Sequence, residues 1–311
     1  MSASRHGLLL LHKKTGISSF DSLKGVKRAF ATGKAGHTGT LDKFASGLLL
    51  VLVGRAVKIA SLFNQCDKEY LGTVHFGRET DTLDPEGAVI AEGALPSREQ
   101  VEKVLGNFRG HILQAPPAYS ALHINGRRAH ELVREGKEPL MKERPVTVHN
   151  LEIISWQPPE AVIHVSCSAG TYIRSLARDI ALAAGSRAYL SSLTRTKIAC
   201  FRLEDAAIDT GEDDNLVKAL RPLDQKLFES ISLPYFLLDE KEVEDFSHGK
   251  ALEIILGKGQ YCVSEEGSGE ILSTTEKKSA GVFRKNSPDK LLGILEFRDG
   301  KWSYGHVFTD N

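Results

Sequence analysis

Apolar and polar positions along this chain predict strands and helices in mixed order. Residues 48–53 are apolar throughout, a run long enough for a buried strand and too short to span a membrane. Strand patterns also occur at 8–12, 70–76, 162–167 and 193–201. Helical spacing of apolar residues is found at 18–30, 55–63 and 172–184, and a capping box of Ser97 and Gln100 precedes a helix to residue 105.

Two of these helices carry specific expectations. The helix at 18–30 should begin at Ser18 or Ser19 and bury Phe20 on its apolar stripe. The helix at 172–184 should hold Arg174 in its first turn, away from its apolar stripe, where the helix dipole mildly disfavours a cation. Arg174 is therefore either a solvated surface cation or a residue with an anionic partner.

The segment 36–47 places one carboxylate in a glycine-framed turn. Its sequence, GHTGTLDKFASG, has three glycines in twelve residues, which favours a tight loop that approaches other backbone closely. The loop leads directly into the apolar run at 48–53, so Asp42 lies at the edge of a core. On spacing alone, Asp42 is either a turn residue or a catalytic group.

Charge is distributed unevenly although the net charge is zero. Residues 1–60 contain ten Lys/Arg against two Asp/Glu, and residues 101–200 contain thirteen against eight. Residues 201–311 contain fourteen against twenty-two. The basic charge thus gathers around the Asp42 loop and in a central segment, which fits a local anionic partner better than a uniformly basic surface.

Cysteine spacing argues against a zinc site or a disulfide framework, because the four cysteines are far apart and form no C-x-x-C pair. This usage fits a reducing, cytoplasmic location. The apolar stretch at 8–11 is followed at once by His12, Lys13 and Lys14, so it is too short for a signal-peptide core. We expect no membrane association and no metal.

Five motifs in order resemble the TruB family of pseudouridine synthases. They are GHTGTLDKFASGLLL at 36–50, DKEY at 67–70 with FGRETDTLDPEG at 76–87, QAPPAYSA at 114–121, CSAGTYIR at 167–174 and LSSLTRT at 190–196. The resemblance implies an enzyme that isomerises a uridine in the T-loop of tRNA to pseudouridine. This reaction has no net redox change, so no cofactor is expected. The matches cover roughly the first 205 residues.

The expected fold is α+β, with a mixed central sheet and flanking helices. Residues 1–234 would form the catalytic domain, with an RNA-contacting insertion at about 117–146. From residue 235 the pattern changes to short strands and glycine turns, and pieces of this segment resemble a PUA-type RNA-binding domain. We predict a monomer whose partner is the T-loop and T-stem of tRNA.

The resemblance also assigns residues to roles. Asp42 would be the catalytic nucleophile or base, and Arg174, permanently charged, would pair with it. Tyr70 would lie against the base and take part in proton transfer. Tyr172 and Leu193 would line the pocket, and His37 would occupy the space left by the flipped base.

A basic segment around a predicted short helix near 129–133 would contact RNA phosphates through Arg127 and Arg134. The family usually has Lys where His123 stands and Tyr where His130 stands. A weaker or more pH-dependent RNA contact is the hypothesis that follows.

Three other functions remain open from the sequence. Asp42 could belong to a carboxylate pair for glycoside hydrolysis, with Asp81 or Asp84 as the second member, although their acidic turn is predicted to be solvated. A guide-RNA-dependent synthase would be a related enzyme. An RNA-binding or tRNA-folding protein with incidental catalysis would be a different class.

Overall fold

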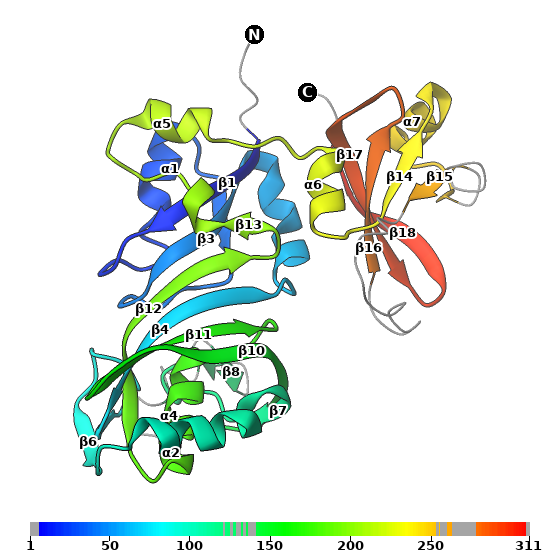
Figure 1. Cartoon of the computed structure of the whole chain (residues 1–311). Helices are drawn as coiled ribbons and strands as arrows, with labels where there is room; N and C mark the ends of the chain where they lie inside the picture. The colour runs from blue at the N-terminus through cyan, green and yellow to red at the C-terminus, as the bar shows by residue number, and fades with distance from the viewer. Residues whose placement is uncertain are drawn as a thin grey trace.

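A large sheet with strand order β1-β3-β12-β4-β11-β10-β7 forms the first part of the molecule (Figure 1). The computed structural model describes residues 6–120, 122–124, 127–128, 132, 135, 141–252, 255, 260–262 and 278–308. Its main strands are β1 Gly7–Lys13, β3 Ser46–Val53, β4 Lys68–Phe76, β7 Gly110–Gln114, β10 Arg144–Gln157, β11 Glu160–Cys167 and β12 Ala188–Ile198. In the described part of the chain, the pair β3–β12 is parallel and the other strand pairs of this sheet are antiparallel, so the sheet is mixed.

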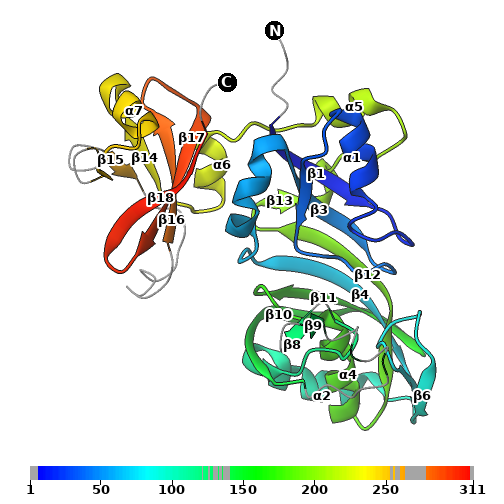
Figure 2. The same cartoon turned by 180° about the vertical axis from the view of Figure 1, so that it is seen from behind.

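Short strands and helices surround this sheet. The short strands are β2 Ala35–Thr38, β5 Arg78–Thr80, β6 Val89–Glu92, β8 His123–Ile124, β9 Arg127–Arg128 and β13 Phe201–Arg202. The helices are α1 Leu23–Ala29, α2 Arg98–Leu105, α4 Ile173–Ala183, α5 Asp213–Lys218 and α6 Gln225–Ser230, with 3₁₀ turns η1 Gly54–Phe63, η2 Gly106–Phe108 and η3 Leu203–Asp205. Figures 1 and 2 show α1 and α5 beside β1, and α2 and α4 beside β10 and β11.

Strand β3 is buried on both faces, which explains its unbroken apolar sequence. Leu49 and Val51 pack with α1 and α5, whereas Leu48 and Leu50 pack with η1. On β4 the alternation is the predicted one, because Tyr70, Val74 and Phe76 all face a core that includes α2 and α4. The capping box of Ser97 and Gln100 at the start of α2 is also confirmed.

The prediction for α1 was wrong at its beginning. The helix starts at Leu23 rather than at Ser18 or Ser19, and Phe20 is 65% exposed. Ser18 instead forms a local turn, in which its hydroxyl accepts a hydrogen bond from the Asp21 amide at 3.0 Å. Serine favours such turns as much as helix caps, and the sequence pattern does not separate the two.

The carboxy-terminal part is a second sheet with strand order β15-β14-β16-β17-β18 (Figure 1). Its elements are β14 Tyr235–Leu238, α7 Glu240–Ser247, β15 Gln260–Cys262, β16 Lys278–Arg284, β17 Ser287–Arg298 and β18 Lys301–Val307. Phe283 and Ile294 of this sheet belong to the same buried cluster as Leu50 and Phe63 of the first part. An apolar core therefore joins the two sheets, and the division into 1–234 and 235–311 stays a prediction.

Candidate active site

The Asp42 loop joins β2 to β3 and is held at several points. The Leu41 amide donates to the Ser19 hydroxyl at 2.9 Å, and that hydroxyl lies 3.0 Å from the Leu41 carbonyl oxygen. Gly39 and Gly47 have φ of 69° and 112°, in the left-handed region that favours glycine. A Cβ at Gly47 would also collide with the Arg195 backbone. The loop is thus closely packed, while the Asp42 side chain remains 39% exposed.

Arg174 lies at the second position of α4, and its side chain reaches Asp42 in the loop. Its side chain is only 5% exposed, and its Nε atom is 2.8 Å from Asp42 Oδ2. Its Nη1 donates to the Thr82 carbonyl at 2.7 Å and its Nη2 to the Tyr119 carbonyl at 3.0 Å. The surface-cation alternative is therefore wrong, and the anionic partner is present. Three nitrogen atoms, each directed at a fixed acceptor, leave the guanidinium one orientation.

Asp84 is the second carboxylate on this arginine, and its predicted exposure was wrong. It is 5% exposed, and its Oδ2 lies 3.3 Å from Arg174 Nη1. The Thr82 hydroxyl donates to Oδ1 at 2.5 Å and the Glu86 amide donates at 3.0 Å. Burial raises the pKa of Asp84, although these hydrogen bonds and Arg174 oppose the rise.

The two carboxylates do not form the arrangement of a glycosidase. Asp42 and Asp84 both face the Arg174 guanidinium, so Asp84 is engaged in holding the arginine. Asp81 is occupied as well, since its Oδ1 accepts a hydrogen bond from the Ala88 amide at 3.0 Å. A glycosidase needs two carboxyl groups facing a substrate from opposite sides. The geometry here supports a single substrate-facing carboxylate.

Tyr70 lies beneath the loop on β4. It is 7% exposed and belongs to the same buried cluster as Leu41, Phe44 and Leu193. Burial raises the pKa of its hydroxyl, the charge of Arg195 lowers this pKa, and the charge of Asp42 adds to the rise. Asp42, Tyr70 and Arg174 are therefore brought together from three elements far apart in sequence.

The other predicted pocket residues lie around this group. Leu193 is 6% exposed beside Tyr70 in the buried cluster. Tyr172 is the N-cap of α4. Its backbone N–H donates to Gln114 Oε1 at 2.8 Å, and Gln114 Nε2 donates to its carbonyl at 3.1 Å. His37 lies on β2; burial and the charge of Arg195 lower its pKa, and among the described residues its Nδ1 has no hydrogen-bond partner.

The predicted RNA-contacting segment is described only in part. Arg127 is exposed on β9 and forms an ion pair with Glu135. Arg134, His130 and the helix predicted near 129–133 lie outside the described residues, apart from Leu132, which is helical. The side chain of His123 also lies outside them. Their roles stay predictions.

Three buried cations under the loop were missed by sequence reasoning. Lys13 is fully buried, and its Nζ donates to the Ala45 carbonyl at 2.5 Å and to the Lys14 carbonyl at 3.1 Å. Arg195 donates to the carbonyls of Leu48 and Gly39 at 2.8 and 3.1 Å. Lys68, 8% exposed, donates to the Cys66 carbonyl. Each sits at an inward-facing strand position, which is the signal that could have found it.

The pKa of Lys13 gives a pH-dependent prediction. Desolvation lowers it to about 8 from an ordinary 10.5, although the charge of Asp42 opposes the change. Above pH 8 the unfolded chain then binds more protons at this residue than the folded one, so stability rises with pH. Relative to Lys13→Met, the wild-type protein should gain up to about 3 kcal/mol of unfolding free energy between pH 8 and 10.5.

Urea denaturation of both proteins across this range measures the difference between the two curves. Lys14→Met is a matched control. Lys14 is the next residue in the chain, but it is exposed, and its Nζ donates to the Asp209 carbonyl at 3.0 Å. Parallel stability curves for wild type and Lys13→Met would contradict the lowered pKa.

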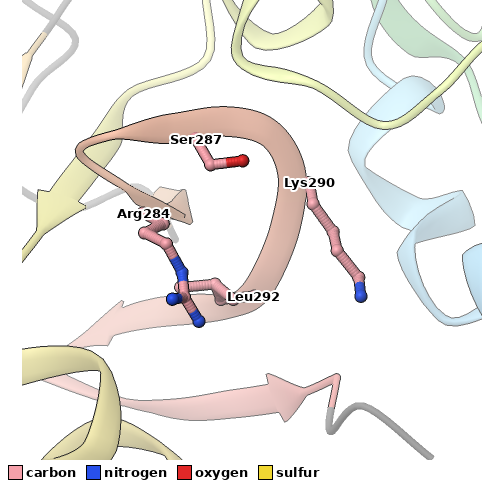
Figure 3. A pocket seen from close by; sticks show the side chains of 4 residues that line it. All are labelled: Arg284, Ser287, Lys290 and Leu292. Carbon is pink, nitrogen blue, oxygen red and sulfur yellow. The ribbon is translucent and has the colours of Figure 1, made fainter. Parts of the chain in front are cut away.

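A hollow of about 240 Å³ lies in the carboxy-terminal sheet (Figure 3). Arg284, Ser287, Lys290 and Leu292 line it, at the hairpin between β16 and β17. Two of its polar groups already have acidic partners, since Arg284 Nη1 is 2.6 Å from Glu240 Oε2 and the Ser287 hydroxyl donates to Asp289. It therefore offers less to an anionic ligand than its cations suggest.

The described part of the chain contains no candidate metal site and no candidate membrane-spanning helix. None of the described helices is long and apolar enough to cross a membrane. Among these same residues, His, Cys, Asp and Glu form no group of three or more that could hold a metal ion.

Comparisons with known proteins point to one family. The family model for TruB family pseudouridylate synthases (N-terminal domain) matches residues 27–173. A Borreliella burgdorferi protein, tRNA pseudouridine synthase B, is 39% identical over 297 residues, covering 94% of this chain and 99% of that protein. Its Treponema denticola namesake is 35% identical over 306 residues, covering 81% of this chain and 86% of the relative.

Two solved structures are similar in fold. The chain aligns with one in a Cbf5–Nop10–Gar1 complex at a TM-score of 0.69 and 21% identity, covering 99% of this chain and 84% of that one. It aligns with a chain in an archaeal box H/ACA Nop10–Cbf5 complex at a TM-score of 0.68 and 21% identity, covering 99% of this chain and 87% of that one. These alignments and the two sheets confirm the predicted fold, a mixed sheet with helices followed by a β-rich carboxy-terminal part.

Proposed function

Since the chain belongs to the TruB family of pseudouridylate synthases, we propose that it isomerises the T-loop uridine at position 55 of tRNA to pseudouridine. The enzyme is a tRNA pseudouridine synthase, and the reaction class is isomerisation. The T-loop uridine and the catalytic role of Asp42 are the parts we propose. The observation that carries the proposal is the half-exposed Asp42 carboxylate fixed at 2.8 Å by the buried Arg174.

The reaction breaks the C1′–N1 bond of uridine, rotates the uracil and forms a C1′–C5 bond. A carboxylate can begin it by attacking C1′, by adding to C6 or by abstracting a sugar proton, and each of these requires the ionised form. Arg174 supplies the compensating charge through Nε to Oδ2. The remaining exposure of Asp42 leaves the carboxylate accessible to a substrate.

A uridine within a folded T-loop must leave its stack to reach this carboxylate, at a cost of a few kcal/mol. Apolar and aromatic side chains are suited to receive a flat base; Tyr70 and Leu193 share a buried cluster with Leu41 and Phe44 of the loop, and Tyr172 begins the helix that carries Arg174. His37, on the strand before the loop, would fill the space that the base leaves. Flipping also opens tertiary contacts in tRNA, so a folding role could accompany catalysis.

We expect Tyr70→Phe to slow product formation about 100-fold with less than a threefold change in tRNA affinity. In this proposal the hydroxyl takes part in proton transfer at C5, and the Phe ring keeps the stacking surface. Single-turnover rates and filter-binding affinities measure the two effects separately. Tyr189→Phe is a control at a partly exposed tyrosine that stacks on His75. Full activity of Tyr70→Phe would remove the hydroxyl from proton transfer.

The test of the function uses purified protein and an unmodified tRNA transcript, with pseudouridine mapped at single-nucleotide resolution. Product at the T-loop uridine without added RNA supports the proposal. Product only after addition of a guide RNA would indicate a guide-dependent synthase. Binding without product would indicate an RNA-binding or tRNA-folding protein.

We further propose that the enzyme acts as a monomer in the cytoplasm. One chain supplies Asp42, Tyr70 and Arg174, so no second copy is needed to complete the site. Arg127, Arg134 and the basic amino-terminal region would contact the phosphates of the T-stem.

A further inference from the structure

Arg195 is the largest fully buried side chain among the described residues, yet it carries a permanent charge. It lies on β12 and is 1% exposed. Burying a cation costs several kcal/mol unless its hydrogen bonds are well satisfied. A methionine or leucine would fill the same space at lower cost, so the charge itself calls for an explanation.

The bonds of Arg195 end on both sides of the Asp42 loop. Its Nη2 donates to the carbonyl of Gly39, three residues before Asp42, at 3.1 Å. Its Nε donates to the carbonyl of Leu48, in β3 just beyond the loop, at 2.8 Å. The Arg195 backbone pairs directly with Gly47, where a Cβ would not fit. The side chain and backbone of Arg195 thus fix both ends of the loop.

The same residue faces Tyr70 on the neighbouring strand. Arg195 and Tyr70 are directly opposed in the register between β12 and β4. The charge of the Arg195 guanidinium also lowers the pKa of the Tyr70 hydroxyl. One side chain therefore bonds to both ends of the Asp42 loop and lies opposite the tyrosine on the neighbouring strand.

We propose that Arg195 is a positioning residue that holds the Tyr70 hydroxyl in register with the Asp42 carboxylate. This inference rests on the proposed function of the site. A guanidinium suits the task because its donors point in fixed, divergent directions to the Gly39 and Leu48 carbonyls, whereas the single ammonium of lysine cannot reproduce this geometry. Arg195 does not touch the substrate; it sets the relative placement of two groups that do.

The experiment is a double-mutant cycle between Arg195→Lys and Tyr70→Phe, read by single-turnover pseudouridine formation in an unmodified tRNA transcript. In the wild-type background, Arg195→Lys should slow product formation about 100-fold, as a misplacement near 1 Å does. In the Tyr70→Phe background, no hydroxyl remains to be placed, so the same change should cost less than about threefold. Transfer RNA affinity should change less than about threefold in all variants.

Two further variants separate positioning from general stability. Arg195→Gln removes the charge but keeps hydrogen-bond donors, and it replaces Arg195→Lys in the cycle if that variant folds poorly. It should show the same loss of rate with Tyr70 present and the same small loss in the Tyr70→Phe background. Lys68→Met removes another buried cation on β4, whose bonds end on the carbonyls of Asn64 and Cys66. Any rate loss from Lys68→Met should be equal in both backgrounds. Thermal unfolding of each variant confirms that the folded fraction is the same.

The outcomes are distinct. If Arg195→Lys slows product formation equally in the wild-type and Tyr70→Phe backgrounds, the positioning role is overturned. A loss confined to tRNA affinity would overturn it as well. Wild-type protein that binds tRNA and forms no pseudouridine would overturn the proposed function instead.

Discussion

Asp42→Asn is expected to reduce pseudouridine formation by about 10⁴-fold or more, the size of effect seen when a reacting group is removed. The substitution preserves the shape of the side chain and its place in the loop. It removes the charge that each possible first step requires, since an amide neither attacks C1′ nor abstracts a proton. Single-turnover conversion of a tRNA transcript measures the loss.

Affinity for tRNA should stay within about threefold, because phosphate contacts dominate RNA binding and Asp42 supplies none. Asp81→Asn is the matched control: the same chemical change in a nearby acidic turn, at a carboxylate bonded to the Ala88 amide. This control should retain activity. If Asp42→Asn kept more than about 1% of the wild-type rate, Asp42 would be a turn residue after all.

The sequence was sufficient where one physical cause dominates a local pattern. The apolar run of β3 can only be buried, and the alternation in β4 directs Tyr70 inwards because side chains alternate along a strand. The capping box of α2 is local in the same sense. For the Asp42 loop, three glycines indicated a close approach, and the structure identifies β12 as the partner.

The sequence was insufficient where burial depends on contacts distant along the chain. The acidic turn that contains Asp84 looks solvated, yet ninety positions separate Asp84 from the Arg174 that makes its burial favourable. Lys13 and Arg195 have the same origin, since each cation donates to backbone carbonyls that only the folded sheet brings near. Local propensity carries no information about such partners.

Arg174→Met is expected to have the largest combined effect on stability and activity. The arginine bridges Asp42 and Asp84, and removing it leaves Asp84 buried with no cation beside it. Breaking a buried ion pair from one side costs about 3–5 kcal/mol of unfolding free energy. Asp42 would also lose its fixed orientation, so product formation should fall about 10³-fold even in protein that remains folded.

Arg178→Met is the matched control for this loss, because Arg178 lies one turn further along α4 and pairs with Asp179 at a partly exposed position. It should cost less than about 1 kcal/mol and leave the rate unchanged. Adding Asp84→Asn to Arg174→Met should restore part of the stability, since the unpaired buried charge is gone, but none of the activity. Urea denaturation and single-turnover kinetics measured together test this separation. Recovery of activity in the double variant would mean that Arg174 serves only to neutralise Asp84, and that Asp42 does not need it.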